Sequence, residues 1–139
     1  MLFAFTGPWT PAPGPRILGN RLQAKGFKKL LVWQKSYELT LHTYRLTKSF
    51  PKDELYGLTS QLRRAVTSIT ANISEGYERN HRKEYVQFLH ISRGSLGEVE
   101  TYLLLARDLE YLADKNFEEL ETRRSEVARL LQGLISSLS

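Results

Sequence analysis

The strongest constraint on the fold is an unbroken row of apolar and small side chains between Tyr85 and Leu109. Its members follow one another at steps of three and four residues, the spacing of one face of an α-helix: Tyr85, Phe88, Ser92, Ser95, Val99, Tyr102, Ala106 and Leu109. A second row beside it contains Leu89, Leu96 and Leu103. A stripe of this width is typical of a helix in a bundle core rather than of a narrow two-stranded coiled coil. The sequence therefore favours an all-α fold.

Three further segments show the same helical spacing. One face of the first is formed by Trp33, Tyr37, Leu41 and Tyr44. The second faces inward with Leu55, Leu58, Leu62, Ala65, Ile69 and Ile73. The last has a row of Phe117, Leu120, Val127, Leu131, Leu134 and Leu138, interrupted by Arg124, which needs solvent or a partner. We expect Asp53 and Asp114 to cap the second and last helices with their side-chain oxygens.

These patterns predict helices at about residues 32–49, 54–77, 81–112 and 115–138. Because the links are short, each helix runs antiparallel to the next, which gives an up-down-up-down four-helix bundle over residues 27–139. Residues 1–26 contain four of the five prolines and four of the nine glycines, without a sustained apolar period. We expect them to form a flexible, disordered basic extension.

The charge of the chain is unevenly distributed. The net charge of +5 is carried by residues 1–29, which hold five bases and no acid, while the remaining 15 Lys and Arg balance 15 Asp and Glu. Between Leu55 and Arg93, however, six bases stand against three acids. Those six are the candidate phosphate contacts: Arg63, Arg64, Arg79, Arg82, Lys83 and Arg93. The alternative is a solvated helix face whose charges pair with nearby acids.

The predicted third helix also carries a patch of small residues. Two glycines and two serines adjoin two leucines of the second apolar row, which gives a candidate subunit contact of Leu89, Ser92, Gly94, Ser95, Leu96 and Gly97. A glycine inside a helix costs about 1 kcal/mol relative to alanine, so close approach of another helix would explain the pair. That helix belongs either to the same subunit or to a neighbouring one. Leu39 and Leu46 lie away from the Trp33 face and also suggest a contact surface.

Residues that carry chemistry are sparse. There is no cysteine, and the single Glu78-Arg-Asn-His81 does not supply the paired motifs of a di-iron bundle. We predict no catalytic residue, metal ligand or cofactor, and a metal-binding bundle or an enzyme is kept as a remote alternative. No apolar run approaches the roughly 18 residues of a membrane span. We expect a cytoplasmic protein that does not enter a membrane.

The segment from Gln61 to Gly76, QLRRAVTSITANISEG, resembles the bacterial four-helix-bundle family of 23S rRNA intervening sequence proteins. The match extends over about residues 27–139 and includes Val32-Trp-Gln-Lys35, Phe50-Pro51, Tyr56-Gly-Leu58, Gly94-Ser-Leu96 and Gly133-Leu-Ile135. The resemblance implies an up-down-up-down bundle that assembles into a homopentamer. It also implies a likeness in fold to the accessory bundle protein of diversity-generating retroelements, which engages a reverse transcriptase and nucleic acid. It carries over no catalytic residues.

Two functional hypotheses follow from the sequence. The first is a non-enzymatic homo-oligomeric scaffold, most simply a pentamer, that binds RNA or a nucleic-acid-processing protein through its basic surface. The second is a purely structural or protein-interaction module without nucleic acid. Binding of structured RNA that weakens steeply with salt distinguishes the first from the second.

Overall fold

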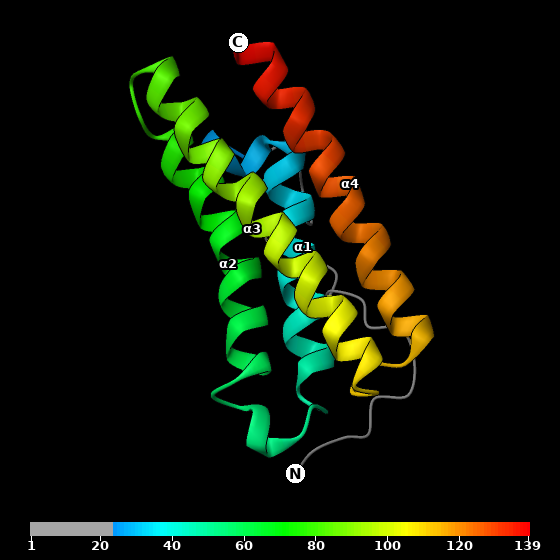
Figure 1. Ribbon diagram of the computed structural model, residues 1–139. Helices are drawn as coiled ribbons and strands as arrows, with labels where there is room; N and C mark the ends of the chain where they lie inside the picture. The colour runs from blue at the N-terminus through cyan, green and yellow to red at the C-terminus, as the bar shows by residue number, and fades with distance from the viewer. Residues whose placement is uncertain (1–23) are drawn as a thin grey trace.

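The computed structural model describes residues 24–139, which form an antiparallel bundle of four helices (Figure 1). The elements in chain order are the 3-10 turn η2 (Gly26–Lys29), α1 (Leu31–Thr47), the 3-10 turn η3 (Lys52–Glu54), α2 (Leu58–Tyr77), α3 (Arg82–Asp108) and α4 (Asp114–Leu138). The described part of the chain contains no strand, so the all-α prediction is confirmed there. Residues 1–23 of the predicted extension lie outside the described residues.

The core is built from one face of every helix. Helices α1 and α3 are diagonal to each other, and each packs against both α2 and α4. The completely buried apolar side chains on α2 and α3 are Leu62, Val66, Ile69, Ile73, Leu89, Val99, Leu103 and Ala106. Leu39, Val127 and Leu131 close the core from α1 and α4. Burial of each such side chain stabilises the fold by roughly 1.5–3 kcal/mol.

The inward face of α1 differs from the predicted one. Leu39 is completely buried, whereas Tyr44, expected in the core, is 39% exposed. The buried face of α1 is partly polar, and this is why the apolar pattern misplaces it. Thr43 Oγ1 donates to the Leu39 carbonyl at 2.8 Å, and Thr47 Oγ1 donates to the Thr43 carbonyl at 2.8 Å. Threonines that satisfy their hydroxyls on their own helix can pack inside without leaving an unpaired donor.

Helix α2 begins at Leu58, after the predicted start near residue 54. The cap comes from Glu54, whose Oε1 accepts a hydrogen bond from the Leu58 amide at 3.1 Å, and the predicted cap by Asp53 is wrong. Asp53 lies instead within the turn η3. Leu55, expected to face inward, is 49% exposed because it belongs to this turn and not to the helix.

The α3–α4 turn also differs from the prediction at both of its ends. Helix α3 ends at Asp108, and Glu110 has a left-handed backbone with φ 64°. The Tyr111 amide donates to the Ala106 carbonyl at 2.9 Å, and the Glu110 amide donates to the Arg107 carbonyl at 2.9 Å. This pair of bonds is a Schellman motif, which usually has glycine at the left-handed position.

Because of this turn, two neighbouring residues lie in other positions than the sequence predicts. Leu109, expected in the core, is 45% exposed because the helix has already ended before it. Asp114 makes no side-chain cap for α4, because it is the first helical residue and Ala113 occupies the capping position. Its carboxylate still lies in the first turn of α4, where the helix dipole favours negative charge.

Candidate nucleic-acid interface

Arg63 is held against α1. Its Nε donates to Thr47 Oγ1 at 2.9 Å, and its guanidinium lies 4.8 Å from the centre of the Tyr44 ring. These contacts leave Arg63 half-buried between α2 and α1. Much of its hydrogen-bonding capacity is therefore used inside the chain.

Arg64 lies on the other side of α2, at a groove between α2 and α3. The groove has a volume of about 480 Å³ and is lined by Gln61, Arg64, Ala65, Ser68, Ile91, Gly94, Ser95 and Glu98. Small side chains form half of its lining, while Arg64 and Glu98 place opposite charges on its two helices. Arg64 is exposed and makes no ion pair with any residue of the described chain.

The α2–α3 turn gathers the next three candidates. Arg79 Nη2 pairs with Glu75 Oε1 at 3.0 Å, and its guanidinium lies 5.0 Å from the centre of the Phe88 ring. Arg82 and Lys83 are exposed in the first turn of α3. Within residues 24–139, neither side chain makes a hydrogen bond or an ion pair. These two cations are therefore available to an external anion.

The six predicted phosphate contacts do not form one patch. Arg93 Nη1 donates to Gln132 Oε1 at 3.2 Å and so lies toward α4, while Arg63 lies toward α1. Arg64 is thirteen residues from the end of α2, about 20 Å at a rise of 1.5 Å per residue. The basic excess of this part of the sequence is thus distributed over several faces.

The predicted subunit contact divides between the inside and the outside of the bundle. Leu89, Ser92, Ser95 and Leu96 are buried within the single chain, which fits the alternative of packing inside one subunit. Ser92 Oγ donates to the Ile69 carbonyl at 2.8 Å, and Ser95 Oγ lies 2.8 Å from Ser68 Oγ. The small residues here let α2 and α3 approach each other within one subunit.

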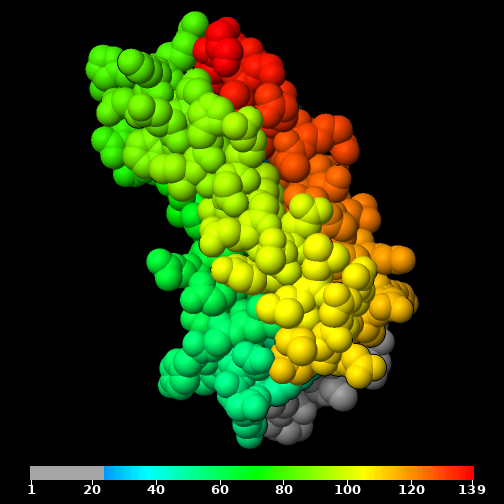
Figure 2. Space-filling view, in the orientation of Figure 1, coloured from blue at the N-terminus to red at the C-terminus, as the bar shows by residue number. Residues whose placement is uncertain are grey.

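Gly94 and Gly97 point away from the bundle instead. Both are exposed, and a Cβ added to either would meet no atom within 4 Å. The same helix exposes three large apolar side chains, Ile91, Leu104 and Leu105, and Leu109 directly follows its end; the exposed fractions of the four lie between 39% and 51%. Figure 2 shows α3 running diagonally down the front of the molecule. Its outer surface is accessible and partly apolar.

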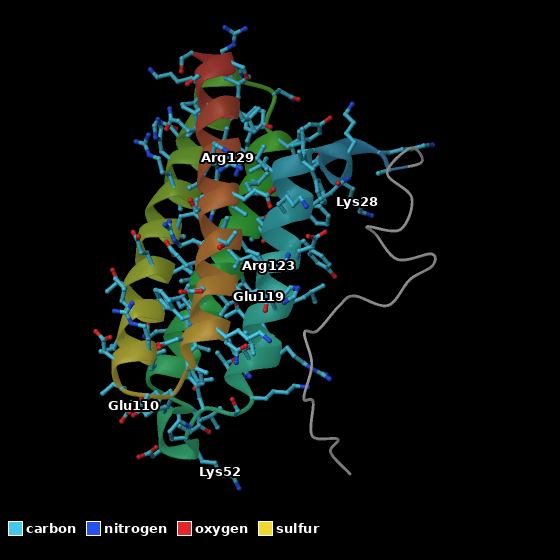
Figure 3. The ribbon with its side chains drawn as sticks, turned by 90° about the vertical axis from the view of Figure 1, so that its right-hand side faces the viewer. Lys28, Lys52, Glu110, Glu119, Arg123 and Arg129 are labelled. Carbon is cyan, nitrogen blue, oxygen red and sulfur yellow. The ribbon has the colours of Figure 1, made fainter. Side chains whose placement is uncertain are left out.

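A charged cluster between α1 and α4 was missed by the sequence reasoning. His42 is buried on α1, and its Nδ1 lies 3.3 Å from Glu119 Oε1. Arg123 Nη1 lies 3.5 Å from Glu38 Oε1, and Lys35 Nζ lies 3.8 Å from the same oxygen. Glu119 and Arg123 occupy the side of α4 that faces α1 (Figure 3). Burial, with a further contribution from the Arg123 charge, lowers the pKa of His42 from 6.5 to about 4.

Arg124, which interrupts the apolar row of α4, has the partner that its position requires. Its Nη2 lies 2.6 Å from Glu121 Oε1 and 3.2 Å from Glu100 Oε2. The hydrogen bonds that Arg124 donates to the Glu121 carboxylate raise the pKa of Arg124 above its ordinary value. Arg124, through Glu100 of α3, and the α1–α4 cluster thus bind several charges of α4 to neighbouring helices.

The turn from α1 to α2 presents an aromatic side chain that the sequence reasoning did not single out. Tyr56 is 92% exposed, and Lys48 and Lys52 are exposed in the same connection. A tyrosine in an apolar sequence context gives no signal that it will be left in water. The capping role of Glu54, which sets the path of this turn, is also visible only in three dimensions.

Glu78 and His81, considered above as a Glu-x-x-His pair, are both exposed at the α2–α3 turn. Residues 24–139 contain no group of three His, Cys, Asp or Glu placed to hold a metal ion. Among the helices of the same residues, none has the length and apolar character to cross a membrane.

Comparison with known proteins places the chain in a family and finds similar solved structures. Residues 28–133 match the family described as 23S rRNA-intervening sequence protein. The chain is also similar to a protein of unknown function from the S23 ribosomal protein family of Bacteroides thetaiotaomicron, solved by crystallography. The identity is 27%, the TM-score is 0.71, and the match covers 76% of this chain and 96% of the other. No protein with curated annotation matches the chain.

Proposed function

Because the chain belongs to the family of 23S rRNA-intervening sequence proteins, we propose that it is a non-enzymatic, homo-oligomeric scaffold that binds RNA. The observation that carries the proposal is the pair of exposed cations at the start of α3. Arg82 and Lys83 make no ion pair within the described chain, unlike Arg79 beside them. Cations that are not neutralised by neighbours attract the phosphate backbone and release its counterions on binding.

Self-association is supported by the outer surface of α3. Ile91, Leu104 and Leu105 expose apolar surface on the helix that also carries the exposed Gly94 and Gly97. Exposed apolar area of this kind marks contact surfaces on soluble proteins. The interface is therefore proposed on the outward side of α3, and the family resemblance supplies the pentamer.

A protein-interaction module without nucleic acid is the second candidate, and the same apolar surface of α3 favours it. On this account, the exposed cations of α2 and α3 are ordinary solvated charges. The two candidates differ in their response to salt. Phosphate contacts weaken steeply as salt rises, while an apolar protein contact does not.

Filter binding of a structured RNA across a salt series tests the proposal. Replacing Arg82 and Lys83 with glutamine is expected to weaken binding and to reduce the slope of log affinity against log salt by about 1.5, or about 0.7–0.9 for each lost contact. The control replaces Lys115 and Arg129, two exposed cations on α4, and removes the same charge from a different face. It should alter the slope much less.

The basic N-terminal residues are a separate source of RNA affinity. A chain that begins at Gly26 keeps all four helices and lacks Arg16, Arg21 and Lys25. The proposal requires this chain to retain salt-sensitive RNA binding. Loss of all binding at low salt would contradict it, as would equal slopes for the α3 and α4 variants.

A further inference from the structure

The connection between α1 and α2 exposes an aromatic ring at one end of the bundle. Tyr56 is 92% exposed, more than any other large hydrophobic side chain in residues 24–139. Its ring makes no aromatic contact within these residues, whereas Phe50 in the same connection lies 5.8 Å from Tyr111. Packing of the bundle therefore does not explain the position of Tyr56.

The backbone that carries Tyr56 is fixed by one carboxylate. Glu54 Oε1 accepts a hydrogen bond from the Leu58 amide at 3.1 Å, and its Oε2 accepts one from the Tyr111 hydroxyl at 2.9 Å. Gly57 leaves room for this carboxylate, because a Cβ there would lie 2.6 Å from Glu54 Oε1. The turn is thus tied to α2 and to the α3–α4 turn. A ring on a fixed backbone loses little further freedom when it binds a partner.

Two lysines accompany the ring. The Leu55 amide donates to the Lys52 carbonyl at 3.1 Å, so Lys52 begins the single 3-10 turn that leads to Tyr56. Figure 3 shows Lys52 projecting from the end of the molecule. Lys48 is exposed at the end of α1, and neither ammonium group makes an ion pair with a described residue. Of the two acids in the turn, Glu54 is already hydrogen-bonded, which leaves Asp53 as the exposed negative charge.

We propose that this turn is a binding site for an unpaired RNA nucleotide, whose base stacks on Tyr56 while Lys48 and Lys52 contact the adjoining phosphates. The proposal rests on the RNA-binding function proposed above and gives it a substrate class, namely unpaired RNA rather than continuous duplex. An exposed aromatic ring binds the π-face of any base, and nearby cations hold the backbone. Bases inside a duplex are stacked on each other and cannot reach such a ring.

Binding of a stem-loop RNA with 2-aminopurine in its loop tests the site in the full chain. Tyr56→Ala is expected to weaken binding about tenfold and to abolish the quenching of 2-aminopurine fluorescence that stacking produces. Tyr56→Phe keeps the ring and should retain both. Because Tyr56 is exposed, both variants should fold as the parent does, which circular dichroism checks. Binding of a fully paired RNA of the same stem should be the same for all three proteins.

The possible outcomes distinguish a failure of the Tyr56 stacking site from a failure of the proposed RNA-binding function. If Tyr56→Ala binds and quenches like the parent while the Arg82 and Lys83 variant is weakened, the stacking site is wrong and the RNA-binding function stands. If the parent binds no stem-loop RNA at low salt, both proposals fail. If Tyr56→Ala instead reduces the mass of the assembly with RNA affinity unchanged, Tyr56 contacts another copy of the chain and the proposed site is wrong.

Discussion

At the scale of single residues, the structure shows charges that serve the bundle and charges that do not. Arg63, Arg79 and Arg124 are bound to neighbouring side chains, whereas Arg82 and Lys83 make no ion pair in the described chain. Sequence spacing does not separate these groups, because pairing depends on which face of the bundle each side chain reaches. All of these cations could be named from the sequence. Only the structure shows which of them are already paired within the described chain and which can bind an external anion.

His42 gives a prediction about pH. The unfolded chain takes up a proton at this residue near pH 6.5, while the folded chain does so near pH 4. Between these values the unfolded state binds more protons, so the free energy of unfolding falls as the pH falls from 6.5 to 4 and then levels off. The shift corresponds to about 3 kcal/mol for a group with no compensating charge. Glu119, 3.3 Å away, stabilises the protonated ring, so this figure is the upper bound of the expected loss.

Urea unfolding followed by circular dichroism at several pH values measures this loss. The comparison is with His42→Gln, which has no titrating group at this position and keeps Glu38, Lys35, Glu119 and Arg123 around it. The parent should lose more stability than the variant between pH 6.5 and 4. An identical pH dependence in both proteins would show that His42 is not held neutral in the fold.

At the scale of the elements, long apolar rows are what sequence reasoning predicts well. The bodies of α2, α3 and α4 follow rows of aliphatic residues, and the structure buries most of them. The face of α1 was misplaced because its buried side includes Ser36, Thr43 and Thr47, whose hydroxyls bond to carbonyls of their own helix. Helix ends also failed where an unexpected residue made the cap, as Glu54 does for α2.

The Schellman turn after α3 supplies a prediction at this scale. Glu110 holds a left-handed backbone, which costs an L-residue about 1–2 kcal/mol relative to its preferred regions. Glu110→Gly removes this strain at a small cost in the freedom of the unfolded chain. We expect the variant to be about 1 kcal/mol more stable by urea unfolding. Glu110→Ala is the control, because it removes the carboxylate but keeps the Cβ, and an equal gain from alanine would contradict the explanation.

At the scale of the whole molecule, the architecture was predictable and the functional surface was not. Short links and four amphipathic segments are enough to give the antiparallel bundle. The candidate contact surface, in contrast, divided in two, because Ser92 and Ser95 point toward α2 while Gly94 and Gly97 point outward. Which face of a helix remains exposed depends on how two helices cross. The spacing of apolar residues along either helix does not determine that geometry.

The central claim is that copies of this chain form a closed assembly that binds RNA. Native mass spectrometry of the full chain with a stem-loop RNA measures subunit number and bound RNA in one experiment. We expect a single closed oligomer, a pentamer, and a second series of the same oligomer carrying RNA, which diminishes when Arg82 and Lys83 are replaced. A monomer without bound RNA at micromolar concentration and low salt would contradict it.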